Sequence, residues 1–439
     1  MIRCNKRGKI LIYKIKRSRI SLQIMFRLTL SQRILSFNTM DFWQKYSKKV
    51  FLLCGSLTMT FVFMQITWFN VYFNNGMYKF SRIAFTEDDL ESEEFHCIDR
   101  LASKYSRVED IFCIVLPQFL PHLKNPCFYD VVLMKKRKLR CLPYFYIIGI
   151  DKSGSTDLHS RLVKHPLVYG NTGVMKKESQ YWCWNRYGIM NKRKGNPKTS
   201  FDSYLDMFEQ TANLIEEKNQ TSVVASDASP MDMWDFRGWT MIPQNEGLPE
   251  PKILTPHFLK YLHKKPPKLI IQLREPIERL YSDYVFLEYG KDPIDFHRHV
   301  VQAIEMMEVC LSNHSRRFCF YDADLYDKLP VRIHLSCYSV FLREWMQVFP
   351  RFAFHIIRTT EYTSDMETTL SGVFKFLELP PLSQSIMQDI LNQTRRHVTA
   401  DKNGVVLPET RRLLQNFYSE CNQETATLLD DKRFLWLDH

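Results

Sequence analysis

One stretch of the chain combines an apolar run, a glycine-containing turn and a helix. The run 145–150 (FYIIGI) is typical of a buried strand, and 156–164 reads as a helix closed by Pro166. A second apolar run, 268–273, precedes Pro276, which is suited to start another helix. Strands that alternate with helices predict a parallel sheet with helices on both faces. Ligands of such sheets bind at the carboxyl ends of the strands.

The turn after the first strand, DKSGST, has the composition of an anion site. Gly154 permits close approach, and Ser155 and Thr156 add hydroxyl donors where free N–H groups and the helix dipole favour an anion. Lys152 supplies a positive charge. Gly149 and Gly154 have the spacing of a nucleotide P-loop, but Ser155 stands where the lysine of that loop belongs. This departure speaks against a P-loop kinase or nucleotidase.

A second cationic position ends the second strand. Arg274 closes LIIQLR, and Ser282 follows eight residues later on the next helix. Both side chains can reach one point above the sheet, where they would offer a guanidinium group and a hydroxyl to a second phosphate. The alternative is an ordinary arginine at a helix start, with an exposed serine.

Together these motifs resemble those of sulfotransferases that use 3′-phosphoadenosine 5′-phosphosulfate (PAPS). In that family a glycine-containing loop grips the 5′-phosphosulfate, and an arginine with a serine eight residues on grips the 3′-phosphate. DKSGST and REPIERLYS match, with Asp151 in place of the usual proline. The resemblance implies a P-loop-like α/β sulfotransferase fold, PAPS as co-substrate and no metal. It assigns to the donor Lys152, Ser153, Gly154, Ser155, Thr156, Arg274 and Ser282, and also Lys402 and Gly404 from DKNGVVLPET.

Further segments are similar to one branch of the Golgi carbohydrate sulfotransferases. These are KNPCFYD, CLPYFYIIG, TDLHSRLVKHP, CLSNHSRRFCFYDADL and LPETRRLLQNFY. That branch sulfates the 6-hydroxyl of N-acetylgalactosamine 4-sulfate in chondroitin and dermatan sulfate. The resemblance extends from Pro117 to the C-terminus and implies a glycosaminoglycan acceptor. The oligomeric state stays open, with a homodimer as one alternative.

The segment VMKKESQYWCW supplies the expected general base. In related heparan-type and chondroitin-type enzymes a glutamate precedes x-H-[FW]-[FW]. Glu178 occupies the matching position, whereas Gln180 stands where the histidine belongs. The alternative is a solvated carboxylate paired with Lys176 or Lys177. Lys152 would neutralise charge on the departing phosphate oxygen.

Three residues are assigned to the acceptor. Arg186 lies in the basic segment RYGIMNKRKGNPK, which would either read sulfate groups or be a solvated loop. Asp227 is assigned by its position in the family, and Lys177 adjoins the expected base. The alternative function is a catalytically inactive lumenal glycan-binding protein, which the departures at Asp151, Ser153 and Gln180 leave open.

The positive charge is concentrated at the N-terminus. Ten Lys and Arg precede Asp41, the first acidic residue, which leaves 50 basic and 48 acidic residues in the rest of the chain. The body is therefore only +2 of the total +12, so no nucleic-acid partner is expected.

A charge-free segment, 50–73, is long enough to span a bilayer. Basic residues precede it and acidic residues follow it, so the positive-inside rule places the N-terminus in the cytosol. A buried core helix and a mitochondrial presequence are the alternatives. We expect a single-pass type II Golgi membrane protein. Its parts would be a cytosolic tail (1–49), a signal anchor (50–73), a stem and lead-in (74–140) and a lumenal sulfotransferase domain (141–439). Met40 is a second candidate for the start of the tail.

Cysteine usage fits a lumenal body. Nine of the 11 cysteines follow the span, and an odd number leaves at least one unpaired within the chain. Cys310 and Cys319 bracket a short loop and form the favoured pair, followed by Cys127 and Cys141. The absence of a C-x-x-C pair argues against a zinc ribbon. Glycosylation sequons occur at Asn219, Asn313 and Asn392.

Overall fold

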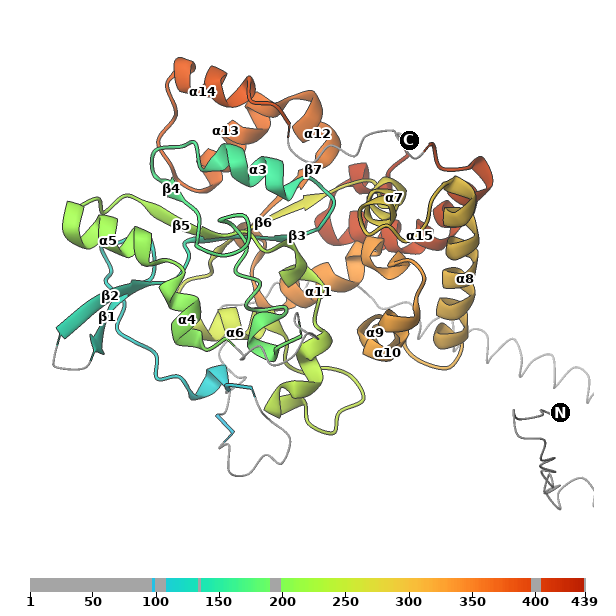
Figure 1. Cartoon of the computed structure of the whole chain (residues 1–439), viewed down its shortest axis with the longest axis horizontal. Coiled ribbons are helices and arrows are strands. Elements are labelled where there is room, and N and C mark those ends of the chain that lie inside the picture. The colour runs from blue at the N-terminus through green and yellow to red at the C-terminus, as the bar shows by residue number, and fades with distance from the viewer. Residues whose placement is uncertain (1–96, 99–107, 133–135, 190–198, 396–403, 438–439) are drawn as a thin grey trace, which may run out of the picture. The chain divides into compact units, whose positions relative to one another are not determined.

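The structure, a computed structural model, describes residues 97–98, 108–132, 136–189, 199–395 and 404–437 (Figure 1). The predicted tail, the signal anchor 50–73 and Lys402 lie outside these residues. None of the helices in the described ranges is both long enough and apolar enough to cross a bilayer.

A five-stranded parallel sheet forms the centre of the described part of the chain. Its first strand along the chain, β3, lies in the middle, and the predicted second strand, β6, pairs directly with it. The strand order is β4 (Val168–Tyr169), β5 (Val224–Asp227), β3 (Phe145–Gly149), β6 (Lys268–Leu273) and β7 (Phe354–Arg358). The sequence prediction of a parallel α/β sheet is confirmed.

Successive residues of a strand point to opposite faces of the sheet. Because both faces carry apolar side chains, both are covered. Along β3, Phe145 and Ile147 belong to one apolar cluster, while Tyr146 and Ile148 belong to a second, larger one. All four are buried, which explains why the strand reads as a continuous apolar run.

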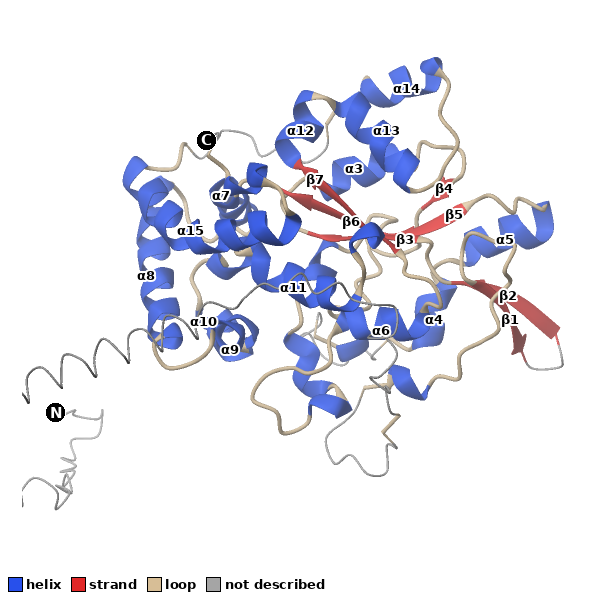
Figure 2. Cartoon of the chain, turned by 180° about the vertical axis from the view of Figure 1, so that it is seen from behind, coloured by secondary structure: helices blue, strands red, loops and turns tan. Residues whose placement is uncertain are grey.

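Two sets of helices provide these clusters. Figures 1 and 2 show α3, α12, α13 and α14 on one side of the sheet, with α4, α6 and α11 on the other. The smaller cluster contains residues of α3 (Ser155–Leu162), α12 (Thr359–Ser364), α13 (Met366–Phe376) and α14 (Gln384–Leu391). The larger cluster involves α4 (Phe201–Asp206), α6 (Thr255–Leu262), α7 (Pro276–Phe286), α8 (Pro293–Leu311), α9 (Arg316–Tyr321), α10 (Ala323–Lys328), α11 (Tyr338–Val348) and α15 (Pro408–Leu429).

Part of the segment expected to be a stem packs against this domain. Val108, Ile111 and Phe112 are buried in the larger cluster. Strands β1 (Cys127–Val132) and β2 (Lys136–Cys141) form an antiparallel hairpin whose apolar residues pack with those of α5 (Glu209–Lys218). The folded domain therefore includes residues well before position 141.

Four disulfides join cysteines of the described residues. The two expected pairs, Cys127–Cys141 and Cys310–Cys319, are both present. The others are Cys97–Cys113 and Cys337–Cys421, and the remaining cysteine, Cys183, is unpaired and buried. Cys337–Cys421 attaches α15 to the start of α11 and closes a loop across a sequence separation of 84. The three sequon asparagines are exposed.

Candidate active site

A cavity of about 860 Å³ is bordered by the ends of β3 and β6, the edge where parallel sheets bind ligands. It brings together most of the residues that the sequence assigned to the donor and to catalysis. Those that line it are Lys152, Ser153, Gly154, Ser155, Thr156, Glu178, Arg274 and Ser282. Segments that are more than 100 residues apart in the chain thus meet in one place.

The glycine-containing loop is shaped for close approach to its neighbours. Gly154 has φ +102°, and an added Cβ would lie 3.2 Å from Nε2 of Gln272, so a side chain here would be strained. The hydroxyl of Thr359 donates to the carbonyl oxygens of Ser153 (2.8 Å) and Leu273 (3.0 Å). These contacts fix the loop to the ends of β6 and β7.

The same region holds buried polar atoms that lack protein partners. Among the described residues, the hydroxyl of Ser153 and the side-chain amide of Gln272 are buried without a hydrogen-bond partner. Both line the cavity beside the first turn of α3, where no side chain caps the helix and the backbone N–H groups lack partners within the helix. Buried polar groups are normally satisfied, so their concentration here fits a phosphate-bearing ligand.

Lys152 lies in the loop with its ammonium over an aromatic ring. Its Nζ is 3.6 Å from the ring centroid of Phe286, the last residue of α7. Burial lowers the pKa of Lys152, and the nearby carboxylates of Asp283 and Asp151 oppose that shift. The lysine is therefore close to the turn that would hold an anion.

Asp151, which replaces the usual proline of the family motif, has its own partners. Its carboxylate accepts hydrogen bonds from Nη2 of Arg332 (2.8 Å) and Nε1 of Trp234 (2.7 Å). Burial raises the pKa of Asp151, and the Arg332 guanidinium opposes this. Arg332 also pairs with Asp283 on α7, so the substitution ties the loop to a neighbouring helix.

Arg274 and Ser282 meet at the same cavity, as the motif predicted. Arg274 donates from Nη1 to the carbonyl oxygen of Lys152 (3.5 Å), and its own carbonyl accepts from the hydroxyl of Tyr338 (2.6 Å). Ser282 is buried on α7 and also lines the cavity. The alternative of an exposed serine is wrong, because this serine is 3% exposed.

Glu178 lines the cavity in a tightly held position. Nζ of Lys177 is 2.5 Å from its Oε1, and Nε2 of Gln180 donates to its Oε2 over 2.9 Å. Burial lowers the pKa of Lys177, while the Glu178 carboxylate opposes that shift. Of the two lysines in the alternative of a solvated carboxylate, Lys177 is the one that pairs with Glu178, but the pair is buried and not solvated.

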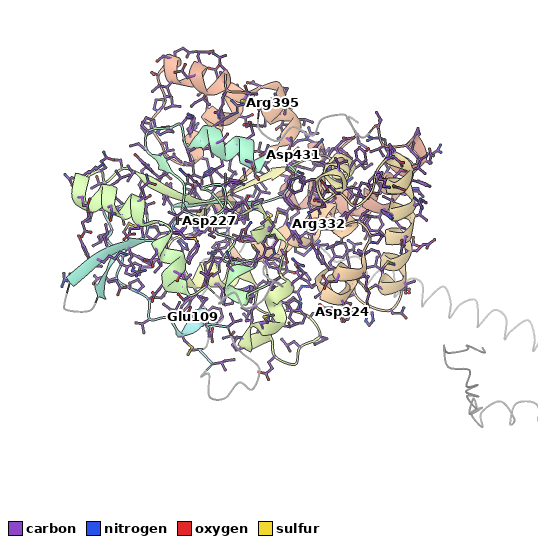
Figure 3. All side chains as sticks on the ribbon, viewed as in Figure 1. Glu109, Asp227, Asp324, Arg332, Arg395 and Asp431 are labelled. Carbon is purple, nitrogen blue, oxygen red and sulfur yellow. A yellow bond between two sulfur atoms is a disulfide. The ribbon has the colours of Figure 1, made fainter. Side chains whose placement is uncertain are left out.

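The residues assigned to the acceptor, Lys177, Asp227 and Arg186, are not among the described residues that line the cavity. Lys177 is 2% exposed and faces Glu178 and the carbonyl of Ala228. Asp227, labelled in Figure 3, is buried at the end of β5. It accepts hydrogen bonds from the hydroxyls of Ser179, Ser229 and Tyr204. Asp227 therefore positions the residue that follows Glu178.

Arg186 also differs from its expected place. It is 3% exposed, with its guanidinium 4.3 Å from the ring centroid of Phe258, and it donates to the carbonyl of Glu109. Its neighbours in the basic segment, 190–198, lie outside the described residues. The charge run did not indicate that its first arginine is buried on aromatic rings.

Gly404 is exposed and lies outside the cavity lining. Its φ is +80°, and its carbonyl accepts from the hydroxyl of Tyr281 over 3.0 Å. His257, a histidine outside the cavity lining, accepts from the backbone N–H of Leu254 with Nδ1 and so caps α6. Neither observation places these residues at the reacting centre.

Three further arginines line the cavity, two of which Figure 3 labels: Arg332, Arg395 and Arg411. They come from distant parts of the chain and share no motif with the donor loop. Of the three, only Arg411 lies in a segment that resembles the 6-sulfating branch, LPETRRLLQNFY, and its spacing there does not indicate a place in the cavity.

The fold and the cavity are those of an α/β protein with cationic and hydroxyl side chains at the edge of a parallel sheet, next to an oriented carboxylate. The chain belongs to the sulfotransferase domain family, whose model matches residues 143–407. It is a carbohydrate sulfotransferase.

Similar proteins include carbohydrate sulfotransferase 15 of Mus musculus and of Homo sapiens. Each is 32% identical over 418 residues, which cover 81% of this chain and 71% of the relative. The membrane-associated sulfotransferase kil1 of Dictyostelium discoideum is 24% identical, over 68% of this chain and 67% of that protein. A sulfotransferase structure from Alicyclobacillus acidocaldarius is 16% identical, with a TM-score of 0.43 over 66% of this chain and 96% of that one.

Proposed function

We propose that the protein transfers a sulfuryl group from PAPS to a glycosaminoglycan, at the 6-hydroxyl of N-acetylgalactosamine 4-sulfate in chondroitin or dermatan sulfate. The observation that carries the proposal is that one cavity contains the DKSGST loop, the Arg274–Ser282 pair and Glu178. The motif resemblance to the 6-sulfating branch supports the acceptor, and the relatives named carbohydrate sulfotransferase 15 support the chemistry.

The donor site divides between two strand ends. Backbone N–H groups at the start of α3, the hydroxyl of Ser153 and the ammonium of Lys152 would hold the 5′-phosphosulfate. Arg274, directly after β6, and Ser282, on α7, would hold the 3′-phosphate. A nucleotide with phosphates at both positions satisfies both ends of the cavity.

Glu178 is the proposed base. As the acceptor oxygen forms its bond to sulfur, its proton passes to the Glu178 carboxylate, and the bond from sulfur to the phosphate oxygen breaks. Lys177 and Gln180 hold the two carboxylate oxygens from different sides, so the base has one orientation before the acceptor arrives.

Lys152 stabilises the leaving group. Its ammonium would move from the ring of Phe286 to the phosphate oxygen on which negative charge develops. Asp151, the residue before Lys152, is held by Arg332. Its carboxylate therefore competes less with the phosphate for the ammonium of Lys152. The chain's own cations and the helix N-terminus thus provide the positive charge for the step.

We also propose a type II Golgi membrane protein with this domain in the lumen. The charge-free span 50–73 supports the anchor. Four disulfides and three exposed sequons fit an oxidising secretory compartment. Glycosidase treatment of protein expressed in cells should increase its gel mobility. A C-terminal tag that protease digests in sealed microsomes would contradict this topology.

The function is tested with an acceptor panel. Full-length protein is incubated with PAPS carrying labelled sulfate and with chondroitin 4-sulfate, dermatan sulfate, unsulfated chondroitin or heparan sulfate. We expect the label in the first two polymers. Transfer to heparan sulfate alone would overturn the proposed acceptor, and donor binding without transfer to any polymer would favour a glycan-binding protein.

A further inference from the structure

A carboxylate is shared by two arginines at the end of the cavity that holds Arg274. Glu278, in the first turn of α7, pairs through Oε1 with Nη2 of Arg411 (2.6 Å). Its Oε2 is 3.8 Å from Nη2 of Arg274. All three residues line the cavity, together with Ser282 one turn further along α7. One arginine directly follows β6 and the other lies in α15, and these elements are far apart in sequence.

We propose that Glu278 is a counter-ion that the 3′-phosphate of the donor replaces, and that Arg411 is a second arginine for this phosphate. The inference rests on the proposed function and adds two residues to it. Guanidinium groups bind carboxylates and phosphates through the same paired N–H···O contacts. Two arginines that reach the two oxygens of one carboxylate can therefore reach two oxygens of one phosphate.

The ion pairs of Glu278 are suited to exchange. The side chains of Arg274, Glu278 and Arg411 are 29%, 35% and 28% exposed, and the Arg274 contact is long. Partly exposed pairs of this kind contribute little free energy. A phosphate brings up to about two negative charges to the same guanidinium groups and forms stronger, charge-assisted hydrogen bonds. Phosphate binding would thus displace the carboxylate, which remains nearby as a competitor.

The pair of Arg411 with Glu278 is not the only attachment of α15. The disulfide Cys337–Cys421 joins this helix to the start of α11, and Leu414 and Tyr418 are buried in the larger apolar cluster. Loss of the Arg411 side chain should therefore leave α15 in place. This separates a role in binding from a role in holding the fold.

The competing carboxylate has a consequence for turnover. When 3′,5′-adenosine bisphosphate (PAP) remains after transfer, Glu278 competes with its 3′-phosphate for both arginines. The competition weakens product binding and so speeds its release. Neutralising the carboxylate should tighten PAP binding, a gain that a damaged fold would not produce.

The test measures by calorimetry how tightly full-length protein binds two ligands at one salt concentration. The ligands are PAP and adenosine 5′-monophosphate (AMP), which lacks the 3′-phosphate. The variants are Arg411→Ala and Glu278→Gln. Arg412→Ala is the matched control, because Arg412 is the exposed neighbour on the same helix and does not line the cavity. We expect Arg411→Ala to weaken PAP binding about tenfold, the scale of a charge-assisted contact, and Glu278→Gln to tighten it roughly threefold or more. AMP affinity should be unchanged in every variant.

Equal loss of PAP and AMP affinity in Arg411→Ala would overturn the inference, as would no loss of either. A Glu278→Gln variant that binds PAP more weakly would also overturn it. These failures leave the proposed function standing as long as the unmodified protein binds PAP and Arg274→Ala reduces that binding. If the unmodified protein does not bind PAP, both the inference and the proposed donor are wrong.

Discussion

The ammonium of Lys177 lies 2.5 Å from a carboxylate oxygen of its sequence neighbour Glu178. The two residues follow a tight turn, in which Val174 and Glu178 form an antiparallel bridge, with positive φ at Met175 and Lys176 between them. The turn directs one lysine inward and leaves Lys176 exposed. A buried cation thus holds the carboxylate that we assign as the base.

Replacing Glu178 by glutamine should separate binding from catalysis. The amide keeps the shape of the side chain but cannot accept the proton from the acceptor hydroxyl. We expect sulfate transfer to fall roughly a hundredfold or more, the usual scale for a lost general base. PAP affinity by calorimetry should stay near that of the unmodified protein. Near-normal transfer would show that another group is the base.

Removing the charge of Lys177 should impair both the site and the fold. Lys177→Met leaves the partly buried Glu178 carboxylate without its cation, which costs about 3 kcal/mol when one partner of a buried pair is removed. We expect a lower midpoint in chemical denaturation and slower transfer, with PAP affinity retained. Lys176→Met is the matched control and should change none of these. Equal effects of the two substitutions would refute the role given to Lys177.

Lys152→Ala should reduce donor affinity as well as turnover, unlike Glu178→Gln. The lysine is expected to contact the donor before the reaction and the leaving phosphate during it. A lost charge-assisted contact predicts about a tenfold weaker affinity for PAPS. Calorimetry and transfer assays on the same preparation measure the two effects. Unchanged donor affinity would place the ammonium away from the phosphates.

Buried histidines predict acid sensitivity. Burial lowers the pKa of His159, His263 and His334 to about 3 each, whereas an unfolded histidine titrates near 6.5. Between these values the unfolded chain binds protons that the folded chain does not. The free energy of unfolding therefore falls as the pH falls from 6.5 towards 3, by up to about 1.4 kcal/mol per pH unit for each histidine.

Denaturation curves at pH 7.5, 6 and 5 measure this slope. His263→Asn removes one of the three groups at a position away from the cavity, where Nε2 contacts the hydroxyl of Tyr146. The variant should be less stable at every pH but should show a smaller slope, by about one proton. An unchanged slope would mean that His263 titrates normally in the folded protein.

The sequence predicted those parts of the site that are local to one strand, turn and helix. Lys152 to Thr156 and the Arg274–Ser282 pair follow directly from strand ends, and they meet because β3 and β6 are neighbours in the parallel sheet. Glu178 was found only through the resemblance to a family motif, because its turn carries no regular pattern. The fold class, in contrast, follows from the residues themselves, because buried apolar runs that alternate with helices predict a parallel sheet.

Burial and long-range pairing were not predictable from the sequence. The guanidinium of Arg186 packs on the ring of Phe258, and Asp227 accepts hydrogen bonds from the hydroxyls of Ser179, Tyr204 and Ser229. Arg411 reaches the cavity because α15 packs beside α7, a contact between segments more than 100 residues apart. Such placements depend on tertiary packing, which one sequence does not reveal.

Disaccharide analysis of the product tests the central claim most directly. Chondroitin 4-sulfate is incubated with full-length protein and PAPS carrying labelled sulfate, then digested, and the disaccharides are separated. We predict that the label appears in disaccharides whose N-acetylgalactosamine carries sulfate at both the 4- and 6-positions, and that Glu178→Gln abolishes most of it. Label on the uronic acid, or no label on any sugar although PAP binds, would contradict the account.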